Sequence, residues 1–581
     1  MQRHKAGVAA AALMLVILIA GVAAIWREAR IAETHRRRAE ARFNDVRKLA
    51  NSLIYEIHDS IKDLPGATQA RKLILQRSLE YLDNLTKESG NDPALLRELA
   101  MAYSRIGELQ GSPEDPNFGD TNGALASFQK SLQIRESLAR ANRQNSKDQV
   151  ELAVAYMDYS DLARGAAGNV AMGFEYCKKA VAILDREAAS APRDFRIVAQ
   201  STRAYSALGI MQVGEGAMGS VGTVTGGVAD LQKALILVQR TLEISPSYAS
   251  GHGQVAVINA VLGDAMLKLG NRPRALAYFH RALDVLQTLN SKGNNIRSAA
   301  NWVIVTGKIG DVLLVEGKNS EAIACYSKAK QSAERLAAVD PHNEMLQRVL
   351  IVTYAQLGHA LAESGGWETG LEYIRKAGGL TEAEPAQTPL IQTFKGVIEL
   401  WSGEALEREQ KMNDAVQHYA RGKEILGAVH TGNPTDLRAQ IYYSSAIDRL
   451  GVALLKLGRT GEARKEFEQS LAMLDPLSRS DSNNQEVLYA LAETYASEGR
   501  TSAKLAARSR APGEELANWT AARGWFQKSL DTWSKVSNPA RICTSGLEVM
   551  LPDEVARRRA NCDGRIESLK DPVRSNLSVP E

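Results

Sequence analysis

One spacing recurs along the chain and constrains its fold more than any other feature. A glycine is followed after twelve residues by a small residue, after four more by a large apolar residue, and after three more by another small residue. Five copies begin at glycines 47, 48, 45 and 48 residues apart, and self-similarity at such a period indicates a repeat architecture. The copies are Gly263, Ala275, Phe279 and Ala282; Gly310, Ala322, Tyr326 and Ala329; Gly358, Gly370, Ile374 and Ala377; Gly403, Ala415, Tyr419 and Gly422; and Gly451, Ala463, Phe467 and Ser470.

The spacing predicts pairs of antiparallel helices. Small residues on both helices let the backbones cross closely, and the large apolar residue fills the space between them. Turn-forming residues lie between the two helices of a pair, at 269–273 and 457–461 for example. One pair cannot bury its apolar face alone, so neighbouring pairs have to stack into a continuous core.

These motifs resemble the tetratricopeptide repeat, a helix–turn–helix unit that stacks into a superhelix. RALAYFHRAL at 274–283 and EARKEFEQSL at 462–471 carry the resemblance, together with Leu-Gly pairs such as Leu262-Gly263. FQKSL occurs at 128–132 and 526–530, and both segments are predicted to be second helices. We expect an all-α, tetratricopeptide-like helical solenoid with about nine repeats over residues 91–538, interrupted by a glycine-rich insertion at 214–227.

A long apolar run stands near the N-terminus, after a short flank of residues 1–5. Residues 6–26 contain no charged side chain, and at about 1.5 Å per residue they span roughly 30 Å, which predicts a transmembrane helix. A cleaved signal peptide is the competing interpretation, although the run is long for one. Arginines at 27–42 outnumber the basic residues before the run, so the charge count alone places the repeats in the cytoplasm.

Composition and motifs exclude several functional classes. A net charge of +4, from 71 basic and 67 acidic residues, does not favour nucleic-acid binding, and four cysteines exclude a disulfide-built scaffold. The chain lacks H-E-x-x-H, C-x-x-C, Walker-type and G-x-S-x-G motifs, so no enzyme, metal site, cofactor or small-molecule substrate is predicted. Gly214–Val221 fits the phosphate-covering loop of protein kinases, but the lysine, H-R-D and D-F-G elements do not follow, which favours a flexible loop.

A more specific resemblance concerns residues 36–85, RRRAEARFNDVRKLANSLIYEIHDSIKDLPGATQARKLILQRSLEYLDNL. This segment is similar to the region that joins the membrane helix to the repeats in bacterial receptor-type Ser/Thr protein kinases with C-terminal tetratricopeptide repeats. The resemblance covers the chain from about residue 7 onward. The kinase domain of those proteins is missing from this chain. The resemblance implies a single-pass protein of the bacterial inner membrane with extracytoplasmic repeats, in conflict with the charge count.

The juxtamembrane part, residues 27–90, is predicted to be helical. Helices over 40–64 and 68–88 would be separated at Pro65-Gly66 and would form either a cap on the first repeat or a stalk. Residues 539–581 form a C-terminal tail, in which Cys543 and Cys562 either pair or remain free thiols.

The predicted function is that of a membrane-anchored scaffold. The concave surface of the solenoid would bind a protein or peptide partner, with no catalysis of its own. Polar residues on first helices that could reach a partner, or else form ordinary solvated surface, are Asp264, Lys268, Lys308, Asp311, His359 and Asp448. The alternative function is the sensor part of a receptor Ser/Thr protein kinase whose catalytic domain is not in this chain.

Overall fold

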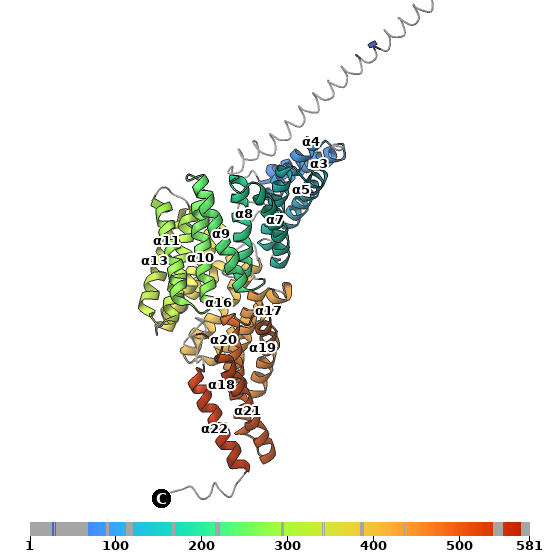
Figure 1. Cartoon of the computed structure of the whole chain (residues 1–581). Helices are drawn as coiled ribbons and strands as arrows, with labels where there is room; N and C mark the ends of the chain where they lie inside the picture. Colours follow the sequence, from blue (N-terminus) through green and yellow to red (C-terminus); the bar gives the residue numbers. More distant parts are fainter. Residues whose placement is uncertain are drawn as a thin grey trace, which may run out of the picture. The chain divides into compact units, whose positions relative to one another are not determined.

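The fold is all-α. The computed structural model describes residues 26–27, 30, 68–88, 92–111, 120–165, 169–214, 221–291, 296–339, 341, 343–383, 388–434, 436–537 and 550–570. These residues form the helices α3 to α22 and contain no strand, which confirms the prediction of an all-α helical repeat fold (Figure 1). The predicted transmembrane helix lies outside the described residues, except for Trp26.

The described residues form nine antiparallel helix pairs that follow one another in sequence. The first helices are α4 (Pro93–Gly111), α6 (Ser146–Arg164), α8 (Phe195–Val213), α10 (Ala249–Lys268), α12 (Ile296–Val315), α14 (Glu344–Glu363), α16 (Pro389–Arg408), α18 (Leu437–Lys456) and α20 (Gln485–Ala506). The second helices are α5 (Thr121–Ala141), α7 (Val170–Ser190), α9 (Val224–Ile244), α11 (Arg272–Ser291), α13 (Asn319–Val339), α15 (Trp367–Ala383), α17 (Met412–Gly432), α19 (Thr460–Ser480) and α21 (Pro512–Trp533). Before them stands α3 (Thr68–Glu88), and after them α22 (Pro552–Lys570).

Eight of the nine described pairs are held by a close crossing at the residues of the repeated spacing. Phe279, Ala275 and Ala282 are fully buried, and the Phe279 ring lies directly over Gly263. A Cβ atom built on Gly263 would stand 2.4 Å from that ring, so only a residue without a side chain fits there. The same arrangement joins Gly310 to Tyr326, Gly358 to Ile374, Gly403 to Tyr419, Gly451 to Phe467, and Gly499 to Phe526.

The chain reverses within three residues in five of the pairs. The middle residue of the turn has a positive φ, for example 75° at Gly270 and 80° at Gly458, which glycine adopts without steric cost. Gln410 holds the same place between α16 and α17 with a φ of 63°. The turn geometry is therefore set by the helix pair even where the residue type does not favour it.

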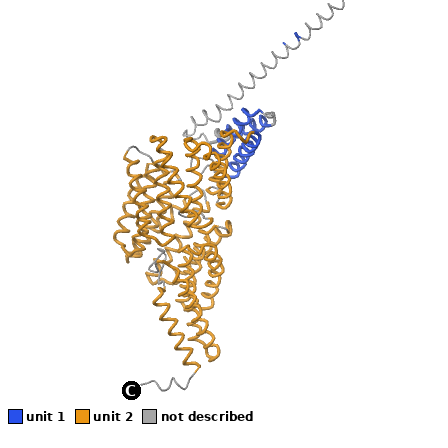
Figure 2. Tube along the Cα trace, viewed as in Figure 1, with its two compact units in different colours: residues 1–141 blue, residues 142–581 orange. Residues whose placement is uncertain are grey.

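The chain divides into two compact units (Figure 2). Unit 1, residues 1–141, contains α3 and the first helix pair, α4 and α5. Unit 2, residues 142–581, contains the other eight pairs and α22.

Two segments differ from the sequence-based prediction in extent. Helix α9 begins at Val224, so the glycine-rich insertion predicted at 214–227 ends in a helix, and its residues 215–220 lie outside the described part. The C-terminal tail contains α22, which packs its buried Val555, Cys562 and Ile566 against the last repeat. Cys562 carries a free thiol, and Cys543 lies outside the described residues.

Among the described helices, one is long and apolar enough to cross a bilayer by length and composition. This helix is α12, and 61% of its most apolar 18-residue window is buried inside the protein. It packs between α11, α13 and α14, as a core helix of the repeat array does.

The close crossing leads to a stability prediction. Gly263→Val would place methyl groups inside the Phe279 ring, and overpacking of this kind typically costs about 1–3 kcal/mol. We expect a lower urea midpoint by circular dichroism. The matched control is Gly524→Ala on α21, where a Cβ meets open space. It should raise stability by about 0.5–1 kcal/mol through helix propensity, and equal effects of the two variants would contradict the crossing argument.

Candidate functional site

The first helices form the inner side of the curved array. In unit 2, neighbouring first helices contact each other directly, as α10 and α12, α12 and α14, and α18 and α20 do. Contacts between neighbouring second helices are absent or slight among the described residues. An array of pairs that touches on one side only curves toward that side, so the first helices line the concave inner face.

A ladder of polar contacts links the first helices on this inner face. At its N-terminal end, Lys308 of α12 forms an ion pair with Asp264 of α10, and both side chains are 13% exposed. On the next step, the Gln356 amide of α14 donates to both carboxylate oxygens of Asp311 at 3.1 Å. The Tyr326 hydroxyl donates to the same carboxylate at 2.7 Å. Asp311 therefore ties three helices together.

The ladder continues over α14, α16, α18 and α20. The His359 Nε2 atom lies 3.0 Å from a Glu404 carboxylate oxygen, and Arg449 forms an ion pair with the same Glu404. His359 also stacks on Trp401 with 4.7 Å between the ring centroids. On the last step, the Thr494 hydroxyl donates to Asp448 at 2.7 Å. Each partner stands 44–46 residues from the other, which is one repeat period.

Burial raises the pKa of several carboxyl groups on the ladder. Desolvation raises the pKa of Asp311 to about 6 and is opposed by its hydrogen bond from Tyr326. It raises the pKa of Glu493, beside Thr494, to about 7, and the pKa of Asp448 stands well above its ordinary value for the same reason. A buried carboxyl favours its neutral form, so Asp311 and Glu493 lose their protons closer to neutral pH than exposed carboxyl groups do.

A row of apolar side chains runs beside the ladder. Each residue stands six positions before the glycine of its repeat, and the row consists of Val257, Ile304, Val352 and Val397. Ile304 is 37% exposed, and the other three are partly exposed although they belong to inner helices. In unit 1, Met101 holds the same place before Gly107 and is 50% exposed. In unit 2 the row therefore presents one apolar contact on each first helix from the fourth to the seventh repeat, beside paired charges, whereas Arg203, Ser445 and Glu493 hold this place in the third, eighth and ninth repeats.

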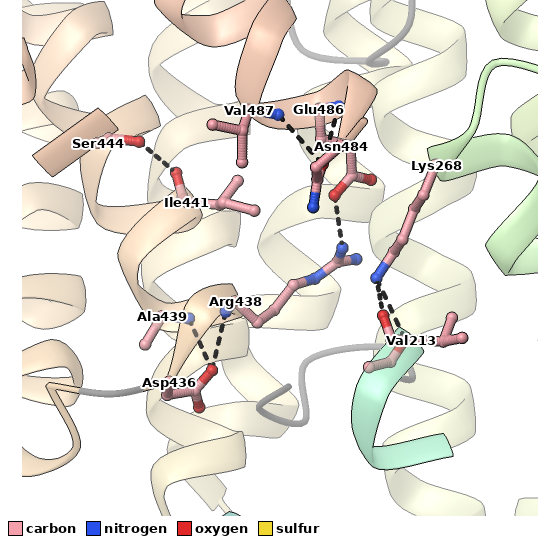
Figure 3. Close-up of polar contacts among 11 residues, drawn as sticks. Val213, Lys268, Asp436, Arg438, Ala439, Ile441, Ser444, Asn484, Glu486 and Val487 are labelled. Atoms are coloured by element: carbon pink, nitrogen blue, oxygen red, sulfur yellow. Dashed lines mark hydrogen bonds and ion pairs between the residues drawn. The ribbon is translucent and has the colours of Figure 1, made fainter. Parts of the chain in front are cut away.

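In unit 2, helix pairs far apart in the sequence come into contact at a group of residues that we call the clasp (Figure 3). Lys268, the last residue of α10, donates to the carbonyl oxygens of Val213 and Gly214 at the C-terminal end of α8. A cation is favourable at that end of a helix. Arg438 of α18 pairs with Glu486 of α20 at 3.1 Å, and both charges act on the Lys268 ammonium.

Further contacts of the clasp join the third and fourth pairs to the eighth and ninth. The Val224 amide at the start of α9 lies 3.4 Å from an Asp481 carboxylate oxygen after α19. Gly270, in the turn of the fourth pair, lies against Ser537, whose amide donates to Gln485. Lys268 is 7% exposed, and desolvation lowers its pKa to about 8. The clasp therefore holds two ends of the inner face together.

The six residues singled out from the sequence lie on these two features. Asp264, Lys308, Asp311, His359 and Asp448 belong to the ladder, and Lys268 belongs to the clasp. Sequence reasoning missed Glu404, Arg449 and Glu486, because it did not pair charges one repeat period apart. That period was visible in the sequence and could have found them. Within the described ranges, no group of His, Cys, Asp and Glu side chains is placed to hold a metal ion.

Comparison with known proteins found similar folds at low sequence identity. No protein-family model and no curated protein matches the sequence. A Rap protein complexed with Competence and Sporulation Factor is 11% identical over 82% of this chain and 100% of its own, with a TM-score of 0.42. RapI in its apo form has 11% identity, coverage of 72% and 96%, and a TM-score of 0.40. Yeast Tom70 has 12% identity, coverage of 92% and 99%, and a TM-score of 0.34.

The raised pKa of Asp311 leads to a pH-dependent prediction. Between its ordinary pKa of 3.8 and its folded pKa of about 6, the folded state holds a proton that the unfolded state has released, so stability falls as pH rises. Asp311→Asn cannot ionise. Its stability relative to the unmodified protein should rise from pH 4 to pH 7 by up to roughly 3 kcal/mol. Urea unfolding at both pH values measures this difference, and a constant difference would contradict the assignment.

Proposed function

We propose that this protein is a non-catalytic scaffold that binds a protein or peptide partner along the inner face of its helical repeats. The observation that carries the proposal is the row of partly exposed apolar residues, one on each first helix from the fourth to the seventh repeat. A regular row of this kind offers periodic contacts to an extended or helical segment.

The ladder supports the same proposal. Its charged groups are paired between repeats, so they fix the register of neighbouring first helices and with it the positions of the apolar row. The six residues predicted from the sequence would then influence a partner by fixing the shape of the surface and through their electrostatic field. They are Asp264, Lys268, Lys308, Asp311, His359 and Asp448. A partner with polar groups beside its apolar contacts fits this surface best.

Residues 6–26 would anchor the scaffold in the bacterial inner membrane. Their apolar length supports a single membrane helix, and the resemblance to receptor-type kinases supports extracytoplasmic repeats. The same resemblance supports an alternative role as the sensor part of a receptor Ser/Thr kinase. The mass of the polypeptide in native membranes separates the two roles, because the scaffold alone has 63.2 kDa and a kinase fusion is much larger.

Site-specific photocross-linking tests the binding face. We expect p-benzoylphenylalanine at position 352, in the apolar row, to give discrete cross-linked products in native membranes. The matched control is position 236, because Ile236 is 62% exposed on the second helix α9. Ile304→Glu should abolish the products from position 352, since it introduces a charge into the row. Products that form equally at both positions, or that survive Ile304→Glu, would overturn the proposal.

A further inference from the structure

A second row of inner-face side chains lies one helical turn from the apolar row. Gln200 of α8, Gln254 of α10 and Asn301 of α12 each stand nine positions before the glycine of their repeat. Gln254 precedes Val257 of the apolar row by three residues, and Asn301 precedes Ile304 by three. Two side chains three residues apart lie on one face of a helix. The glycines of these repeats are Gly209, Gly263 and Gly310. We call the three side-chain amides the amide row.

This place in the repeat lies where neighbouring first helices meet. In the second repeat it is held by Glu151, because Ser160 takes the place of the glycine and donates to the Gly173 carbonyl oxygen of the paired helix at 2.7 Å. Glu151 forms an ion pair with Arg196 of the next first helix, α8. Helix α10 contacts both α8 and α12 directly. The amide row therefore crosses three adjacent first helices of the inner face.

The amide row has hydrogen-bonding capacity that the described residues do not use. The Oε1 atoms of Gln200 and Gln254 are buried and have no hydrogen-bond partner within the described part of the chain. By contrast, Gln356 of the ladder donates to Asp311. Gln200, Gln254 and Asn301 are partly exposed as whole residues, so rotation of an amide can present its oxygen or its nitrogen to a bound molecule. A buried acceptor without a donor costs free energy, and a ligand that supplies the donor removes this cost.

A row of amides matches the chemistry of a polypeptide backbone. A side-chain amide donates through its nitrogen and accepts through its oxygen, as a peptide group does. An α-helix already uses its backbone groups in internal hydrogen bonds and leaves only those at its ends free. An extended segment leaves the N–H and C=O groups of its residues available to a neighbour. The amide row therefore favours an extended segment over a helix.

The amide row and the apolar row divide the inner face along its length. In the third repeat, Arg203 takes the place of the apolar residue and pairs with Asp158 and Asp161 of α6. The residues nine positions before the glycine in the sixth, seventh and eighth repeats are Val349, Phe394 and Tyr442. Amides are thus concentrated on α8, α10 and α12, whereas the apolar row runs from α10 to α16.

We propose that the inner face binds an extended segment of a partner protein, and that Gln200, Gln254 and Asn301 hydrogen-bond to its backbone. Apolar side chains of the segment contact Ile304 and the other residues of the apolar row. This inference rests on the proposed function and specifies the conformation of the partner and the groups that recognise it. The segment needs no particular charge, because the charged groups of the ladder and Arg203 are already paired within the protein.

The spacing of contacts along the partner distinguishes an extended segment from a helix. Helices in direct contact have axes about 8–10 Å apart. An extended chain advances about 3.3 Å per residue and an α-helix about 1.5 Å per residue. One repeat therefore corresponds to about three residues of an extended partner and about six residues of a helical one.

Photocross-linking of the full chain in native membranes measures this spacing. p-Benzoylphenylalanine is placed at position 304 or at position 397, which lie two repeats apart in the apolar row, and the cross-linked partner residues are mapped by mass spectrometry. We expect the two sites on the partner to be about six residues apart. A separation of about twelve residues would identify a helix and would overturn this inference while leaving the proposed function intact. Absence of discrete products from both positions would overturn both.

A pair of substitutions tests the amide row itself. Gln254→Met combined with Asn301→Leu keeps the side chains at similar size and removes their hydrogen bonds. The yield of products from position 352 should fall by roughly tenfold, as expected for the loss of two hydrogen bonds. The urea midpoint should not fall, because the variant removes a buried acceptor that has no donor among the described residues. The matched control is Gln287→Met on α11, where the residue is exposed, and it should change neither quantity.

Two results of this second experiment would overturn the inference. One is an unchanged yield in the double variant under conditions where Ile304→Glu abolishes the products, because the partner would then bind without the amides. The other is a lower urea midpoint in the double variant, because Gln254 and Asn301 would then stabilise the repeats and not the bound segment.

Discussion

The close crossing of the two helices in each pair is the contact on which the rest of the structure depends. A glycine on the first helix lies under a ring or branched side chain of the second, as Gly263 lies under Phe279. Because the crossing recurs along unit 2, first helices of neighbouring pairs lie on one side of the array and contact each other. The inner face, the ladder and the apolar row all follow from that regular stacking.

The ladder shows how a repeat array places charges inside itself. Charges buried between helices are costly unless they are paired, and here each pair joins one first helix to the next. Glu404 accepts both His359 and Arg449, so it links three consecutive repeats. Residues that resemble solvated surface in the sequence therefore determine the register of the surface that the proposed partner would contact.

The clasp adds a constraint that a simple solenoid lacks. Contacts within a stack join only neighbouring repeats, whereas Val224 meets Asp481 across 257 residues. The Lys268 ammonium of α10 lies at the C-terminal end of α8, and the Arg438–Glu486 ion pair acts on it. Charges of both signs therefore lie where the third and fourth pairs meet the eighth and ninth. The inner face of unit 2 is consequently held at both ends, and its curvature is set by more than the stacking angle.

The sequence by itself determined the helix pairs, since small and large residues at 12-4-3 spacing leave few other ways to pack. It could not determine how far the array curves, because curvature accumulates from small angles and no local motif encodes their sum. The pairing of Asp311 with Gln356, the clasp at Lys268 and the left-handed turn at Gln410 were decided by tertiary contacts. Helix α22 was missed for the same reason: few of its residues are apolar, and burial against α21 supplies the stability that its sequence does not indicate.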